Sequence, residues 1–154
     1  MQEETGKLRP GDIVALLTWS EQYSVGVKTM DNQHIAMIDM LNELYEAMME
    51  GNALGVTGPL LHKLVEYTKN HFSSEEQMLA ACGYPDLQEH IAHHKQLIEE
   101  VNQHVADYER QNLFMPIPLL HFLRDWIATH IQKEDRSYGP WVNRTAGPNQ
   151  TKSL

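Results

Sequence analysis

Apolar residues recur along this chain at spacings of three and four, the period of a helix with one buried face. The clearest stretch lies between Asp31 and Gly51. Aspartate is a common residue at helix starts and glycine a common one just past helix ends. The pattern therefore predicts a helix over these residues, with a buried stripe made of Ile35, Ile38, Leu41, Leu44, Tyr45 and Met48.

A second segment of helical length begins at Pro59. Proline suits the first helical position because it lacks an amide hydrogen that the first turn does not use. Gly83 and Pro85 follow the segment and predict its end.

Two more helices are predicted in the remaining chain. Asp86 and Glu89 have the spacing of a capping box at the start of the third helix, which ends near Gln111. The fourth begins near Pro116 or Pro118 and ends by Gly139.

The four predicted helices, each about 30 Å long, indicate an all-α fold, an antiparallel up-down-up-down four-helix bundle. We expect the bundle to span residues 31–142. Residues 1–30 form an irregular N-terminal arm that packs on the bundle through Trp19, Tyr23 and Val25. Residues 143–154 are expected to be a polar, frayed tail.

Composition narrows the possible functions. The 154 residues suit one domain, and the formal charge of −9, without a run of Lys or Arg, argues against nucleic acid as a partner and against membrane insertion. Cys82 is the single cysteine, so an internal disulfide is excluded. The acidic N-terminus does not resemble a signal peptide, and we expect a cytoplasmic protein.

Nine histidines are more than twice the number expected from average usage, about three or four. His71 and Glu75 are four residues apart, as are His90 and His94. Residues at this spacing differ by about 40° around a helix and share a face. Each pair taken alone is also compatible with ordinary surface histidines.

The bundle topology brings such pairs together. The start of the first helix, the later half of the second, the early part of the third and the end of the fourth meet at one end of an antiparallel bundle. Five imidazoles and two carboxylates could converge there on a dinuclear metal site, from His34, His71, Glu75, His90, His94, His130 and Asp135.

Two positions remain ambiguous from spacing alone. His93 shares a face with His90 nearly as well as His94 does. Asp135 lies five residues after His130, about 140° around an ideal helix, so the helix either ends there or widens into a π-type turn. The histidines assigned to the surface or to a supporting role are His62, His93, His104 and His121.

The order His, H-x3-E, H-x3-H, H-x4-D resembles the hemerythrin family, specifically its bacterial single-domain members. The DNQH, GYPD and DWIATHI segments match as well, and the resemblance covers about residues 19–141. It implies two iron ions per chain, bridged by Glu75, Asp135 and an oxo or hydroxo group. One iron would be held by His90, His94 and His130, the other by His34 and His71.

The resemblance implies reversible O₂ binding by a carrier, store or delivery protein rather than by an enzyme, with at most weak oxidase or peroxidase side activity. The ligand set supports this, because ferritin-like di-iron sites are richer in carboxylates. Neutral histidines stabilise high-valent iron less well. Apolar residues within one helical turn of a ligand are expected to wall the O₂ pocket, namely Met37, Phe72, Trp126 and Ile127.

Other functions stay open. The alternatives are an O₂ or redox sensor domain, a di-iron enzyme acting on peroxide or nitric oxide, a repair protein for iron–sulfur centres, and a structural zinc site. The lack of a signalling module argues against the sensor, and the lack of cysteine in residues 1–30 argues against repair. We expect a monomer that could pass O₂ to an O₂-consuming protein.

Overall fold

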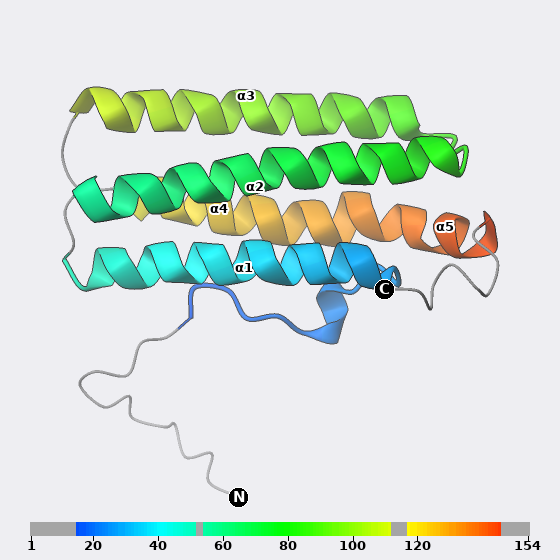
Figure 1. Cartoon of the computed structure of the whole chain (residues 1–154), viewed down its shortest axis with the longest axis horizontal. Coiled ribbons are helices and arrows are strands. Elements are labelled where there is room, and N and C mark those ends of the chain that lie inside the picture. The colour runs from blue at the N-terminus through cyan, green and yellow to red at the C-terminus, as the bar shows by residue number, and fades with distance from the viewer. Residues whose placement is uncertain (1–14, 52–53, 112–116, 146–154) are drawn as a thin grey trace, which may run out of the picture.

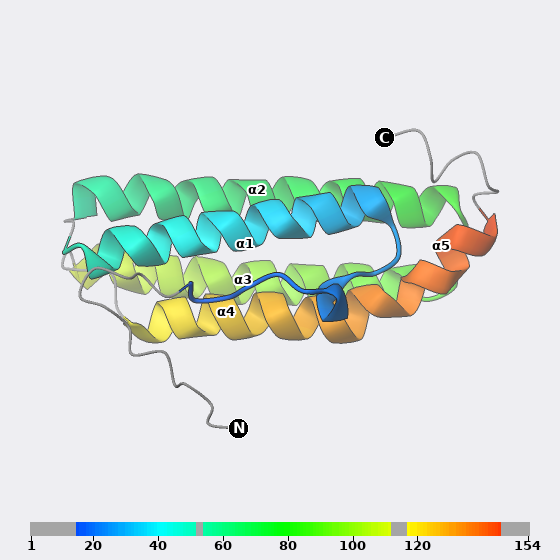
Figure 2. The same ribbon diagram turned by 90° about the horizontal axis from the view of Figure 1, so that it is seen from below.

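The computed structural model describes residues 15–51, 54–111 and 117–145. Four long helices run antiparallel along the molecule: α1 (Lys28–Met49), α2 (Leu54–Ala81), α3 (Leu87–Gln111) and α4 (Ile117–His130) (Figure 1). Helices α1 and α3 each pack on both α2 and α4, so the four form a closed bundle, as Figure 2 shows from below. The predicted all-α four-helix bundle is confirmed.

The helical path continues beyond α4. A π-helical turn, η2 (Ile131–Asp135), is followed by the 3₁₀ turn η3 (Arg136–Tyr138) and by α5 (Gly139–Thr145). The predicted stop at Gly139 is therefore wrong. Gly139 has helical backbone angles, and Pro140 falls in the first turn of α5, where its missing amide hydrogen costs no hydrogen bond.

Two predicted helix starts are also wrong. Helix α1 begins at Lys28, and the carboxylate of Asp31 accepts hydrogen bonds from the arm instead, from Val25 N at 2.8 Å and Ser24 Oγ at 2.7 Å. Helix α2 begins at Leu54, so Pro59 lies inside it, in the second turn. The helix gives up one backbone hydrogen bond there but keeps the φ that proline prefers.

The predicted ends of the first three helices agree with the structure. Gly51 and Gly83 follow α1 and α2 with φ of 75° and 66°, values that favour glycine. After α2, the amide of Gly83 bonds to Ala80 O and that of Tyr84 to Leu79 O, the pair of bonds that closes a Schellman motif. Helix α3 then begins directly after Asp86, where it was predicted.

The core runs the length of the bundle. Ile38, Leu41 and Leu44 of the predicted α1 stripe are at most 2 % exposed, whereas its other three members lie half-buried at the stripe's edges. Leucines of α2 and α4 are equally buried in the same core. No helix in the described part of the chain is long and apolar enough to cross a membrane.

The described part of the arm is held against the bundle. Tyr23 and Val25 are buried, while Trp19 is half-buried and its ring lies beside that of Tyr23. Further along α1, Asn42 exchanges two hydrogen bonds with the backbone of Leu17. At the other end, Gly139 approaches the carbonyl of Val25 so closely that a Cβ atom would collide with the oxygen.

Candidate metal centre

All seven predicted site residues lie together at the end of the bundle where α1 begins and α2 ends. They come from five elements, because α1 provides one residue, α2 two, α3 two, and α4 and η2 one each. Every one is buried, and the most exposed of them is 6 % accessible. They are His34, His71, Glu75, His90, His94, His130 and Asp135.

Their ligand atoms form two overlapping groups, in each of which all atoms lie within 4.8 Å of one another. Glu75 and Asp135 belong to both groups. The three-histidine group adds His90, His94 and His130. The two-histidine group adds His34 and His71.

The shared carboxylates divide their oxygens between the two groups. Oε1 of Glu75 lies 2.5 Å from His90 Nε2 and 3.1 Å from His94 Nε2, while its Oε2 lies 3.3 Å from His71 Nε2. In the same way, Oδ1 of Asp135 lies 3.0 Å from His130 Nε2 and its Oδ2 3.0 Å from His34 Nε2. Each shared carboxylate therefore places one oxygen beside each group of histidines.

The π-helical turn brings Asp135 to this position. An α-helix would place residues five apart on different faces, whereas a π-helix, with its i to i+5 bonding, stacks them. The amide of Arg136 bonds to Ile131 O, five residues earlier. Of the two alternatives that the sequence left open for Asp135, the widened turn is the one the chain adopts.

The donor set fits metal ions better than a hydrogen-bonded network. His94 Nε2, His130 Nε2 and both oxygens of Asp135 are buried with no hydrogen-bond partner of acceptable geometry. The Nε2 atoms of His34 and His71 are 3.1 Å apart. Two nitrogens bound at about 2.1 Å and at right angles to one ion would be ~3.0 Å apart. Imidazole nitrogen with carboxylate oxygen is a donor mixture that iron accepts.

In the metal-free site, burial and the neighbouring charges shift the pKa values of the clustered carboxylates and histidines. Burial and the charge of Asp135 would raise the pKa of Glu75, but close contacts with the rings of His71, His90 and His94 outweigh them and lower it. Burial likewise opposes ionisation of Asp135, yet His130 and other histidines keep its pKa well below the usual value. Burial would lower the pKa of His90, but the nearby carboxylates of Asp135 and Glu75 raise it to about 10.

The pKa values of His71 and His130 shift in opposite directions. Burial lowers the pKa of His71. For His130 burial also acts downward, but the charge of the nearby Asp135 carboxylate raises the pKa overall. In the metal-free protein, protonated His90 therefore offsets part of the charge of the two buried carboxylates, and a metal would have to displace its proton.

Three residues that the sequence did not single out support the cluster. Gln33 Oε1 accepts a hydrogen bond from His71 Nδ1 at 2.6 Å, and Glu76 Oε1 one from His94 Nδ1 at 2.9 Å. Because both bonds join neighbouring helices, the spacing of residues along the chain does not predict them. Tyr138, in η3, donates a 2.9 Å hydrogen bond to Oε2 of Glu75.

The predicted pocket residues are all buried, at 7 % exposure or less. Phe72 stacks on His94, with ring centroids 3.7 Å apart, and Trp126 lies parallel to His130 at 6.0 Å. These ring contacts are therefore with the three-histidine group. The other two predicted pocket residues are Met37 and Ile127.

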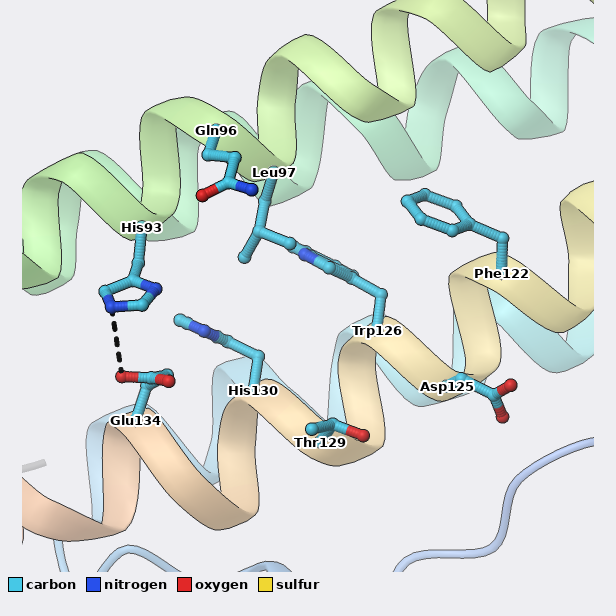
Figure 3. Close-up of a pocket in the computed structure, with 9 residues that line it drawn as sticks. All are labelled: His93, Gln96, Leu97, Phe122, Asp125, Trp126, Thr129, His130 and Glu134. Atoms are coloured by element: carbon cyan, nitrogen blue, oxygen red, sulfur yellow. Dashed lines mark ion pairs between the residues drawn. The ribbon is translucent and has the colours of Figure 1, made fainter.

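A groove of about 460 Å³ runs between α3 and α4 over Trp126 and His130 (Figure 3). His93 stands at its edge and faces Glu134, with 3.8 Å between Nε2 and Oε2, so the structure brings His94 rather than His93 into the cluster. The histidines that lie exposed on the surface are His62, His104 and His121.

Comparison with known proteins gives a consistent result. Residues 25–142 match the family model described as the hemerythrin HHE cation binding domain. A bacteriohemerythrin of Methylococcus capsulatus is 32 % identical over 131 residues, which are 84 % of this chain and 99 % of the relative. A myohemerythrin of Theromyzon tessulatum is 24 % identical and shares 78 % of this chain and 88 % of its own.

A solved wild-type hemerythrin structure superposes with a TM-score of 0.77 at 32 % identity, covering 83 % of this chain and 98 % of its own.

Proposed function

Because this chain belongs to the hemerythrin family, we propose that it binds O₂ reversibly at a non-haem di-iron centre, as a carrier, store or delivery protein. The family and the buried ligand cluster together place the chain among non-haem iron proteins of the O₂-binding kind. The proposal of a di-iron centre rests on one observation: the oxygens of Glu75 and Asp135 are divided between two groups of histidines.

In this proposal the three-histidine group holds one iron and the two-histidine group the other. Glu75 and Asp135 bridge the two, together with a solvent-derived oxo or hydroxo group. Because the second group has only two histidines, it would offer one protein ligand fewer to its metal, and O₂ could take that place. When bound, the iron pair would supply the electrons for reversible O₂ binding. The protein supplies ligands that are already in place and buried.

Apolar surroundings support binding over reaction. Four buried apolar residues lie within a helical turn of a proposed ligand, at positions 37, 72, 126 and 127. Trp126 and Ile127 also border a cavity of about 10 Å³ inside the bundle. The hydroxyl of Thr68 in its lining donates to Leu64 O at 2.8 Å, and the only other side-chain polar atom of the lining is the indole nitrogen of Trp126. Such a cavity is at the lower size limit for one small molecule and favours an apolar one.

The proposal is tested by metal analysis and visible spectroscopy of protein produced with ample iron. We expect two irons per chain, a spectral change when the reduced protein meets O₂, and the return of the original spectrum when O₂ is removed. A single metal per chain, mainly zinc, or an irreversible change would contradict it. Rapid consumption of O₂ or peroxide would favour an enzyme.

The assignment of ligands is tested by comparing two histidines. His71→Ala should abolish the O₂-dependent spectral change, because the proposed O₂-binding iron has only one histidine besides His71. His94→Ala should instead weaken binding of the other metal. His62→Ala, on the exposed surface, is the matched control and should leave both properties unchanged. Normal, stable oxygenation of the His71→Ala protein would show that the assignment is wrong.

A further inference from the structure

The two groups of proposed ligands differ in the charge of their outer hydrogen-bond partners. His71, of the two-histidine group, donates to the neutral amide of Gln33. His94, of the three-histidine group, donates to the carboxylate of Glu76. Each group thus has one described histidine with an outer side-chain acceptor, and only the acceptor of the three-histidine group is an acid.

Each contact fixes the orientation of the histidine ring and determines which of its nitrogens carries the proton. A histidine that donates through Nδ1 presents an unprotonated Nε2 to the metal, and its partner sets the ring orientation and basicity. The amide of Gln33 is oriented in turn, since its Nε2 lies 3.4 Å from Ser74 Oγ. The His94 ring is held further by its stack with Phe72.

The environment of Glu76 keeps its charge close to the site. Its side chain is 30 % exposed, whereas that of His94 is 3 % exposed. It lines a groove between α2 and α3 together with Phe72 and His94. A carboxylate that accepts a hydrogen bond from a nearly buried imidazole acts where screening by water is weaker than on an open surface.

We propose that Glu76 and Gln33 are positioning residues that make the two metal positions unequal. This inference rests on the proposed di-iron function. The charge of Glu76 makes His94 the stronger donor and favours the ferric state at the three-histidine position. The neutral amide of Gln33 holds the His71 ring without adding charge, so a ferrous ion at the two-histidine position would be less readily oxidised.

The test exchanges the two kinds of acceptor. Glu76→Gln keeps an oxygen for His94 Nδ1 but removes the charge, and Gln33→Glu adds a charge beside His71. Glu99→Gln is the control, since Glu99 lines the same groove and bonds to none of the described histidines. Metal affinity is measured on the metal-free proteins with Co²⁺ against a competing chelator, and reduction potentials are measured on the iron-loaded proteins.

We expect Glu76→Gln to lower the affinity for one of the two Co²⁺ ions about tenfold, within the 10–100-fold range known for residues that hydrogen-bond to metal ligands. The same variant should raise the reduction potential of the iron-loaded protein. Gln33→Glu should change both quantities in the opposite direction. Glu99→Gln should match the wild type. The double variant, Gln33→Glu with Glu76→Gln, should keep two metals per chain. The difference between the reduction potentials of its two irons should be smaller than in the wild type or reversed in sign.

Two results would overturn the inference. One is a Glu76→Gln protein that matches both the control and the wild type. The other is equal weakening by Glu76→Gln and Gln33→Glu, which would assign both residues to packing alone. In either case a wild type that binds two irons and O₂ leaves the proposed function standing. A wild type that fails to bind two metals contradicts the proposed function itself.

Discussion

Tyr138 donates a hydrogen bond of 2.9 Å to Oε2 of Glu75, and both residues are completely buried. The bond joins the turn that follows the π-helix to the middle of the ligand cluster. Burial and the negative charges of Glu75 and Asp135 raise the pKa of Tyr138 well above its ordinary value, so its hydroxyl stays a donor. The bond thus holds one shared carboxylate in place from outside the metal positions.

Tyr138→Phe removes this donor and leaves a buried carboxylate oxygen short of one partner. We expect the free energy of unfolding of the metal-free protein to fall by about 1–3 kcal/mol, measured by denaturant titration. Tyr84→Phe is the control, because the Tyr84 ring packs edge-on against Tyr138 while its hydroxyl bonds to no described residue. Equal losses in the two variants would show that the hydrogen bond to Glu75 contributes nothing.

Gly139→Ala tests the contact between the arm and the end of the bundle. The added methyl group would collide with the backbone carbonyl of Val25, which cannot rotate away as a side chain could. The expected loss is about 1–3 kcal/mol, the usual cost of overpacking, again measured by denaturant unfolding. Pro140→Ala, at the exposed next position, should cost only about 0.4–1 kcal/mol. A Gly139→Ala protein as stable as the wild type would mean that the arm moves without cost.

The metal-free protein should be most stable in mildly acidic solution. His90 has a raised pKa of about 10, so its contribution is fully present below its unfolded value of about 6.5 and is lost as the pH rises towards 10. Glu75 and Asp135 have lowered pKa values. Their contribution is present above their unfolded values of about 4 and is lost on acidification.

The measurement is the unfolding free energy of the metal-free protein from pH 4 to 10, compared with that of His90→Gln. The variant should lack the contribution of His90 to the alkaline decline. A wild-type stability that stays constant between about pH 6.5 and 10 would contradict the predicted protonation of His90. Loading with metal should also reduce this decline, because bound metal replaces the histidine protons.

Ile127→Asn tests the apolar wall proposed for the O₂ pocket. Ile127 is 1 % exposed and borders the internal cavity. The amide of an Asn side chain would place a hydrogen-bond donor at the cavity and draw in water. All seven proposed ligands would stay in place. We expect O₂ still to bind but the oxygenated form to decay faster in air, at matched iron content.

Ile127→Val is the control for packing and should cost about 0.5–1.5 kcal/mol of stability with little change in lifetime. If the Asn variant keeps the wild-type lifetime and the wild type itself consumes O₂ or peroxide rapidly, an enzymatic role is the better account.

The sequence by itself determined the class of fold and the residues that meet at one end of the bundle. Helical periodicity is local, so Ile38, Leu41 and Leu44 already marked the buried face of α1. A spacing of four residues likewise places His71 and Glu75 on one face before anything is known of the neighbouring helices. The metal roles of the clustered residues stay a prediction until the protein is loaded and analysed.

The tertiary structure decided what local spacing leaves degenerate. His93 and His94 differ by one residue on α3, and only the packing of α3 against α2 turns His94 towards Glu75 and leaves His93 facing Glu134. Asp31 looked like a helix cap, but the arm, folded back over the start of α1, provides its partners from Val25 and Ser24.

The same reason explains the residues that the sequence did not reveal. Gln33, Glu76 and Tyr138 each bond to a side chain on another element, at sequence separations of 38, 18 and 63 residues. The periodicity of a helix states which residues share a face, but it carries no information about the face opposite. That information arises only when the helices pack, and with it the difference in charge between the two sides of the cluster.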